Sequence, residues 1–360
     1  MKTLKNYIFV TLPTILIVLI ILEIVFRIVI PASDPPRAFF NEKEKMYCLS
    51  NKKEAGLYTI GKFAGIRAKW RINNMNWNSP IDYYPIENKK LIAVIGDSFI
   101  ESMEVNVGES YPFLLREKLK NDYEVYAFGK AGSPLSQYLH VSRYVNNHFN
   151  PDIIIFNIVH NDFIESIQEL YPNRNYFLQL SINEHDSIKE TIPKPDYSSP
   201  QYKPLMRLIY NSALFRYLYL NLHANEIRKN IFNPKNIEYE SNTDVNEFKK
   251  NRDLIIKASS YIVKTIREEN LDKKIIFIMD APRESIYNNT LDKSNTIWLN
   301  EILGTICTNN NIEFIDLTND MKINYTEKKI KFNSDLDEHW NEYSHKFIAD
   351  ILYRYLNNIN

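Results

Sequence analysis

Residues 91–105, LIAVIGDSFIESMEV, begin as five consecutive apolar residues and then break at Gly96-Asp97-Ser98. A short apolar run bounded by a turn signal is typical of a strand buried on both faces of a sheet. The break has two interpretations. It is either a structural turn or a nucleophile displayed where a sheet strand ends.

Four further apolar runs repeat this pattern downstream, at 123–128, 153–158, 275–279 and 312–317. Segments with helical 3–4 spacing accompany them, at 110–119, 133–145, 254–266, 302–306 and 341–356. Strands that alternate with helices predict a parallel sheet covered by helices on both faces, so we predict an α/β fold with about five parallel strands. Residues 165–250 interrupt the alternation, and their length predicts a lid or a small subdomain.

The N-terminal segment 7–30 carries only two charges, Glu23 and Arg27, at a spacing that lets them pair on a helix. Its twenty-four residues would span about 36 Å as a helix, slightly more than the hydrocarbon core of a bilayer. The alternative is a cleaved signal peptide, but the run is long and IPAS is a poor cleavage site. We predict a single-pass membrane anchor after a cytoplasmic segment at 1–6, with the rest of the chain outside the cytoplasm.

Composition excludes several classes of protein. The 44 Lys and Arg residues balance 44 Asp and Glu residues, so no nucleic-acid partner is expected. Cys48 and Cys307 are too few for a zinc site or a disulfide framework, although they could pair in an oxidising compartment. The nucleotide-binding motifs G-x-G-x-x-G and G-x-x-x-x-G-K-[ST] and the G-x-S-x-G elbow are absent. We expect no cofactor and no metal, and a loop-rich lead-in at 31–87 before the α/β domain at 88–360.

Chemistry-bearing residues follow the first three predicted strands and precede the last predicted helix. Ligands of open parallel sheets bind beyond the carboxyl ends of the strands. Each residue alone has an ordinary explanation as a turn, linker or surface residue, but together they occupy matching places in one fold. The set comprises Ser98, Gly132, Asn161, Asp335, Asp337 and His339.

Elementary chemistry gives these residues separate tasks. Ser98 is a poor nucleophile until a base takes its proton, and His339 can be that base if a carboxylate orients its other ring nitrogen. The tetrahedral oxyanion then needs preorganised donors. The backbone N–H groups of Ser98 and Gly132 and the side-chain amide of Asn161 are the candidates, and Gly132 stands before a helix, near its positive end.

The motifs resemble those of the SGNH subgroup of GDSL-type hydrolases, over roughly residues 50–360. GDSF is similar to the first family block, with Ser98 as nucleophile, and FGKAGSPLSQ to the second, with Gly132 as an oxyanion donor. HND is similar to the third block, with Asn161, and DEHWN to the fifth, with His339 as base. The resemblance implies a three-layer, flavodoxin-like sheet order and hydrolysis or transfer of acyl esters. An anchor before such a domain is also a familiar layout among envelope-associated members.

Two positions depart from the family pattern. Val159 stands where the third block usually has Gly, which affects local backbone shape. Leu336 replaces the usual Asp three residues before His339, whereas Asp337 matches the shorter Asp-x-His spacing of related members, including enzymes that acetylate exopolysaccharides. We therefore favour Asp337 over Asp335 as the orienting carboxylate.

The sequence thus predicts a serine esterase that removes acyl groups, acetyl in particular, from an envelope carbohydrate. An O-acyltransferase acting on a cell-surface polysaccharide, or a non-catalytic carbohydrate-binding protein that retains the site, is the alternative. Two further histidines are left outside this set. His345 is expected on the exposed side of the last helix, and His160 either contacts substrate or is structural.

Overall fold

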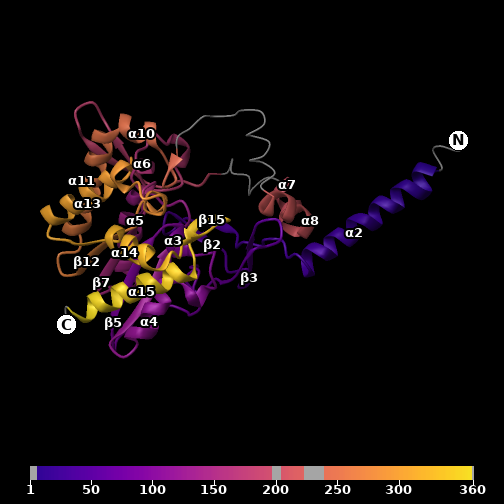
Figure 1. The fold of residues 1–360 in the computed structure, drawn as a ribbon, viewed down its shortest axis with the longest axis horizontal. Helices are drawn as coiled ribbons and strands as arrows, with labels where there is room; N and C mark the ends of the chain where they lie inside the picture. The colour runs from indigo at the N-terminus through magenta and orange to yellow at the C-terminus, as the bar shows by residue number, and fades with distance from the viewer. Residues whose placement is uncertain (1–5, 197–203, 223–238, 359–360) are drawn as a thin grey trace.

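A five-stranded parallel sheet forms the centre of the protein, in a computed structural model that describes residues 6–196, 204–222 and 239–358 (Figure 1). Its strands are β5 (Lys90–Gly96), β6 (Tyr123–Gly129), β7 (Ile153–Ile158), β12 (Lys274–Met279) and β13 (Glu313–Asp316). They lie in the order β13-β12-β7-β5-β6, and every neighbouring pair is parallel. Read from β6, this is the flavodoxin-like order 2-1-3-4-5, so the predicted α/β fold is confirmed.

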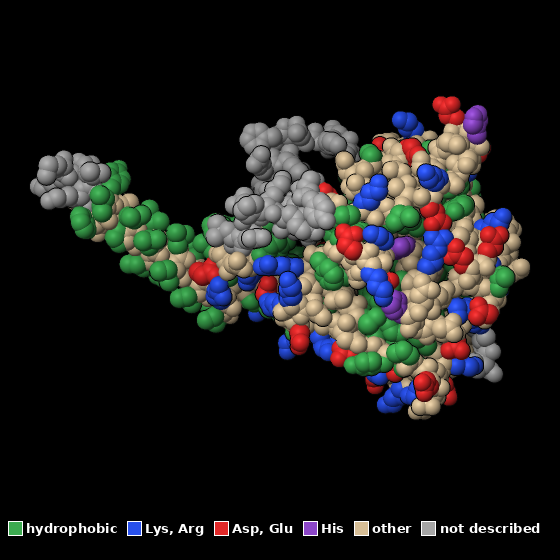
Figure 2. Space-filling model, turned by 180° about the vertical axis from the view of Figure 1, so that it is seen from behind, with side chains coloured by type: hydrophobic (Ala, Val, Ile, Leu, Met, Phe, Trp, Pro, Cys, Tyr) green, Lys and Arg blue, Asp and Glu red, His purple; other side chains and the backbone are tan. Residues whose placement is uncertain are grey.

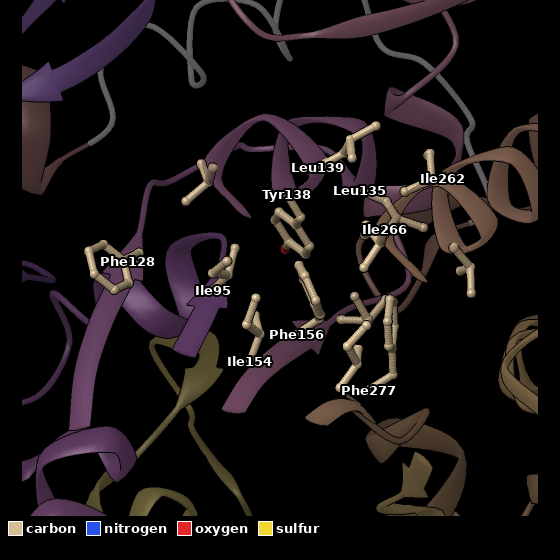
Figure 3. Close-up of a cluster of buried hydrophobic side chains, with 14 of the residues drawn as sticks. Ile95, Phe128, Leu135, Tyr138, Leu139, Ile154, Phe156, Ile262, Ile266 and Phe277 are labelled. Atoms are coloured by element: carbon tan, nitrogen blue, oxygen red, sulfur yellow. The ribbon is translucent and has the colours of Figure 1, made fainter. Parts of the chain in front are cut away.

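Helices cover both faces of this sheet, because successive side chains of a strand point to opposite faces. One face packs against α4 (Tyr111–Leu119), α14 (Thr318–Lys328) and α15 (Glu342–Asn357). The other packs against α5 (Leu135–Phe149), α11 (Arg252–Glu268) and α13 (Ile297–Asn309). Figure 3 shows this second layer, in which Phe156 and Phe277 stack with ring centroids 4.8 Å apart beneath Tyr138 and Leu135.

In the last helix, α15, the prediction for His345 is wrong. The N-cap of this helix is Asn341, whose side chain accepts from Ser344 N at 3.0 Å, but His345 is buried rather than exposed. The Nδ1 atom of His345 accepts from the backbone N–H of Tyr111 at 3.1 Å, which satisfies a donor in the first turn of α4. Burial lowers the pKa of His345 to about 3, so the ring stays neutral and keeps this acceptor.

Two hairpins form most of the lead-in, β1 (Ala38–Asn41) with β2 (Met46–Leu49) and β3 (Ala55–Ile60) with β4 (Ile66–Arg71). Tyr83, which follows them, joins the lead-in to the edge strand β6, because its hydroxyl accepts from Ala127 N at 2.9 Å and donates to Ala127 O at 3.0 Å. Cys48 and Cys307 are buried free thiols.

The N-terminal helix runs through η1 (Tyr7–Thr11) and α2 (Leu12–Ile28) and projects away from the body (Figure 1). Among the described residues, this is the one helix that is apolar and long enough to cross a membrane. It has 22 residues, and none of it is buried. A signal sequence has the same length and composition.

The described parts of the 165–250 insertion pack in two places. The hairpin of β8 (Gln179–Ile182) and β9 (Ile188–Thr191) lies against the body, where Arg143 of α5 pairs with Glu190 at 2.6 Å. The helices α7 (Pro204–Asn211), α8 (Ala213–Arg216) and η5 (Tyr217–Asn221) lie instead beside the end of α2 (Figure 1).

Candidate active site

Ser98 is the first residue of α3 (Ser98–Glu101), directly beyond the carboxyl end of β5. Asp97 caps this short helix, since its Oδ1 accepts from Phe99 N at 2.9 Å, while its Oδ2 accepts from Ser98 Oγ at 3.1 Å. Gly96 permits the tight approach, because a Cβ there would lie 2.4 Å from Ile100 Cγ1. The Gly-Asp-Ser break therefore forms the N-cap of α3 and places the Ser98 hydroxyl at the carboxyl end of the sheet.

His339 reaches this hydroxyl from the other end of the chain. It lies on β15 (Asp337–Trp340), and its Nε2 is 2.8 Å from Ser98 Oγ. Its Nδ1 is 2.5 Å from Asp337 Oδ1, and its backbone N–H donates to the same oxygen at 2.7 Å. Asp335 is exposed and pairs with Lys331 at 3.1 Å. The structure thus brings Ser98, His339 and Asp337 together and leaves Asp335 apart.

Trp340 fixes the strand that carries His339. Its ring is buried, packs edge-on against Phe99 at 5.0 Å, and donates from Nε1 to Asp280 Oδ1 at 3.1 Å. Asp280 follows β12, so this hydrogen bond ties β15 to the central sheet. Phe99 also contacts the His339 ring, with centroids 4.9 Å apart, which limits how far the imidazole can turn.

Glu104 is a site residue that the sequence analysis missed. Its Oε1 lies 3.6 Å from Nδ1 of His339, and its side chain is almost fully buried. A left-handed turn at Ser102 (φ 50°) ends α3 and leads the chain into this position. The only sign of this role in the sequence was an acidic residue, Glu104, in the otherwise uncharged stretch SMEV.

Burial and mutual charge set the protonation of this cluster. Burial raises the pKa of Asp97 to about 6 and that of Glu104 to about 7. Burial also raises the pKa of Asp337, but its hydrogen bonds to His339 and the charge of that ring outweigh burial and lower it. For His339, burial lowers the pKa, yet the surrounding carboxylates, Glu104 first, raise it to about 9. The imidazole therefore holds a proton more firmly than an ordinary histidine.

Gly132 and Asn161, the proposed oxyanion residues, lie after β6 and β7, the strands on either side of β5. Gly132 has φ +76°, in the left-handed region that favours glycine. Its carbonyl accepts from Arg174 Nη1 at 3.0 Å, and Arg174 also pairs with Glu165. The Asn161 side chain hydrogen-bonds the Glu165 carboxylate, so one ionic pair connects both loops.

Two buried carboxylates brace these loops. Glu101 accepts from the backbone N–H of Ala131, next to Gly132. Asp162, next to Asn161, accepts from Val159 N at 2.9 Å and from Tyr138 Oη at 2.7 Å. Burial raises the pKa of Asp162 well above its ordinary value.

Two cavities border the site. The first, of about 30 Å³, is lined by Phe99, His160, Asn161 and Arg283 among others. His160 is fully buried and its Nε2 lies 3.1 Å from Asn300 Oδ1. The second cavity, of about 510 Å³, is lined by His339 and Glu104, and continues along the lead-in and the start of α15.

Residues 92–352 match the sequence profile of the family described as GDSL-like Lipase/Acylhydrolase. The chain belongs to this family. It is an ester-hydrolysing serine hydrolase, as the motifs predicted.

Several solved structures are similar to this GDSL-family chain at low identity. An acetyl xylan esterase is 14% identical over 74% of this chain and 98% of its own, with a TM-score of 0.40. A two-domain esterase active on acetylated mannans is 11% identical over 75% of this chain and 50% of its own, with a TM-score of 0.41. A lipolytic G-D-S-L family protein from Veillonella parvula is 13% identical over 72% of this chain and 94% of its own, with a TM-score of 0.38. No curated protein sequence matches the chain.

Proposed function

We propose that this family member is a membrane-anchored serine esterase that removes acetyl groups from an envelope carbohydrate outside the cytoplasm. Acyl-ester hydrolysis follows from the family to which the chain belongs. The observation that carries the proposed mechanism is the continuous chain of contacts from Ser98 Oγ through His339 to Asp337, at 2.8 and 2.5 Å.

In the proposed reaction, His339 Nε2 takes the proton of Ser98 Oγ as this oxygen attacks the ester carbonyl. The N–H groups of Ser98 and Gly132 and the Asn161 amide hold the negative oxygen of the tetrahedral intermediate. The intermediate collapses when the sugar oxygen leaves with the proton from His339, and an acyl-serine remains. A water molecule, deprotonated by His339, then attacks this acyl group and releases the acid and free Ser98.

The proposed preference for acetyl has the same support as the carbohydrate assignment. The carbohydrate assignment rests on the Asp-x-His spacing, which resembles that of exopolysaccharide-acetylating members of the family.

Retention of the N-terminal helix is supported by its contacts with the body. Glu23 of α2 accepts from Ser212 Oγ at 2.8 Å and from the backbone N–H groups of Ala213 and Leu214 at 2.9 Å each. The ring of Phe26 stacks on Tyr217 with centroids 3.8 Å apart. Cleavage would leave these partners exposed, which favours an anchor over a signal peptide.

O-acyl transfer is the second candidate, because sugar and water compete for the same acyl-serine. The cavity of about 510 Å³ beside His339 offers space for an acceptor sugar. Mass spectrometry of acceptor oligosaccharides incubated with an acyl donor separates the two reactions. Accumulation of free acid without an acylated sugar would rule out transfer for that pair.

The test of the proposed function uses the full-length protein in detergent and a chromogenic acetyl ester. Ser98→Ala and His339→Ala should each lower kcat/KM by on the order of 10³-fold or more. Turnover equal to that of the wild type would exclude the proposed nucleophile. Because Glu104, Asp337 and His339 also bring potential metal ligands within 4.8 Å of one another, EDTA is added in parallel and should leave activity unchanged.

A serine-directed fluorophosphonate tests the non-catalytic alternative. A covalent adduct on Ser98 of the folded protein is expected if His339 activates this hydroxyl. Absence of the adduct, with labelling of a control serine hydrolase in the same sample, would favour a carbohydrate-binding protein instead.

A further inference from the structure

A cationic cavity of about 350 Å³ lies where α2 joins the body. Its lining includes one carboxylate, Asp34, and five cationic side chains, Arg27, Arg37, Lys52, Lys53 and Arg216. Blue side chains gather at this junction in Figure 2, although the protein as a whole has no net charge. The lining of this cavity therefore carries a local excess of positive charge.

The cavity is built by contacts between segments that lie far apart in the sequence. Arg37 of the lead-in lies over the ring of Tyr210 at 5.3 Å, and its Nη2 donates to Asn211 Oδ1 at 3.4 Å. Arg216 of α8 donates from Nε to Ser33 O at 3.0 Å and from Nη1 to Tyr210 O at 2.8 Å. The fold thus places these guanidinium groups around one hollow.

The cations of the cavity are only partly neutralised. Arg27 pairs with Glu23, and Lys53 pairs with Asp34. Arg37, Lys52 and Arg216 form no ion pair with any residue that the structure describes. Unpaired like charges around one hollow repel one another, so an anion bound between them would be stabilised.

The position of the cavity relative to α2 indicates where that anion comes from. The 22 residues from Tyr7 to Ile28 rise about 33 Å as a helix, against a hydrocarbon core of about 30 Å. Arg27 lies in the last turn of α2 and also lines the cavity. In a membrane-spanning α2, this places the cavity at the level of the lipid headgroups.

The neighbouring surface continues the apolar surface of α2. Phe215 of α8 and Leu218 of η5 are 40% and 41% exposed, beside the stacked pair of Phe26 and Tyr217. Exposed apolar residues around a basic hollow are the composition of an interfacial element, which buries its apolar side among acyl chains and its cations among phosphates.

We propose that this cavity binds the phosphate-bearing headgroup of an anionic membrane lipid and so seats the catalytic body on the bilayer. The assignment rests on the proposed retention of α2 as an anchor. The guanidinium and ammonium groups of the lining both suit phosphate, because each donates charge-assisted hydrogen bonds to its oxygens.

The test offers phosphatidylglycerol and phosphatidylcholine in equal amounts to the full-length protein in detergent, and native mass spectrometry counts the lipids retained. The wild type should retain phosphatidylglycerol in preference, and the double substitution K52Q/K53Q should lower this preference at least fivefold. K43Q/K45Q is the matched control, because these two lysines lie in the β1–β2 turn and do not line the cavity. Esterase turnover of both variants reports that they are folded.

Three outcomes would overturn the lipid site: no preference in the wild type, an unchanged preference in K52Q/K53Q, or an equal loss in K43Q/K45Q. Competition by excess inorganic phosphate that removes the bound phosphatidylglycerol would assign the cavity to free phosphate instead. Retention of residues 7–30 is measured separately, by the intact mass of the protein purified from membranes. A mass that lacks residues 7–30 contradicts the anchor, whereas an intact mass without lipid preference contradicts the lipid site alone.

Discussion

At the scale of single residues, the site is governed by how many carboxylates surround one imidazole. Asp337 shares a hydrogen bond with His339, Glu104 lies 3.6 Å from the same ring nitrogen, and Asp97 is held by Ser98. In the proposed mechanism these charges would stabilise the imidazolium that forms during the reaction, and they raise the pKa of His339 to about 9. The carboxylates that favour the imidazolium therefore also keep His339 protonated. Its neutral form, which can accept a proton, is present only at higher pH.

The first prediction concerns this pH dependence. Because the neutral form of His339 is the proposed base, kcat/KM for a chromogenic acetyl ester should rise with pH and level off above about 9. Glu104→Gln removes a negative charge that stabilises the imidazolium, so the pKa of His339 should fall and the rise should move to lower pH. A pH profile of kcat/KM for both proteins measures the shift. An unshifted profile in Glu104→Gln would mean that this carboxylate does not act on His339.

The second prediction separates the two aspartates before His339. If Asp337 is the orienting carboxylate, Asp337→Asn removes the acceptor that fixes the ring tautomer and should lower kcat by on the order of 10⁴-fold, the loss that this change causes in a Ser-His-Asp triad. Asp335→Asn changes an exposed carboxylate that pairs only with Lys331, and should leave kcat unchanged. Steady-state kinetics of the two isosteric variants make the comparison. Similar losses in both would remove the orienting role from Asp337.

At the scale of secondary-structure elements, the short helix α3 is positioned by a glycine on the neighbouring strand. A Cβ at Gly129 of β6 would lie 2.1 Å from Glu101 N, so any side chain there pushes α3 and Ser98 away from the sheet edge. Glu101 in turn holds the backbone beside Gly132. Displacement of α3 would therefore disturb the proposed nucleophile and the proposed oxyanion loop together.

The third prediction follows from this packing. Gly129→Ala should lower the free energy of unfolding by about 1–3 kcal/mol, the usual cost of overpacking, and should also lower kcat. Gly108→Ala is the control, because a Cβ at Gly108 meets no atom within 4 Å. It should change stability by less than about 0.5 kcal/mol. Urea unfolding of the two variants measures both effects, and equal stabilities would contradict the tight contact between α3 and β6.

The four strands β5, β6, β7 and β12 were predictable because each is a largely apolar run, typical of a strand buried on both faces. The edge strand β13 is only partly buried and was found within the run 312–317. Ser98, Asp337 and His339 could be grouped because chemistry-bearing residues stood at strand ends and beside the last helix. Their catalytic roles stay predictions. His345 was placed on the wrong side of its helix, because its partner, the Tyr111 N–H, comes from α4 and leaves no trace in local periodicity. The contact of Glu104 with His339 likewise exists only across the fold.

At the scale of the whole molecule, the insertion connects the catalytic body to the N-terminal helix. Glu23 lies within the apolar helix, and α8 presents its first N–H groups to that carboxylate. A carboxylate at a helix N-terminus satisfies donors that have no partner within the helix. The body and the proposed anchor are therefore joined by a specific contact in addition to the chain itself.

The last prediction tests whether this contact exists in the protein as it is purified. Glu23→Leu keeps α2 apolar but removes the acceptor of the Ala213 and Leu214 amides. Hydrogen bonds to a charged group contribute about 1.5–3 kcal/mol, so these amides should exchange with deuterium roughly tenfold faster or more. Hydrogen–deuterium exchange of the full-length protein in detergent measures this, with Glu42→Leu, an exposed site on the lead-in, as control. Equal exchange at residues 213–214 in both variants would mean that α8 does not dock on α2, and nothing in the contacts of α2 would then favour its retention.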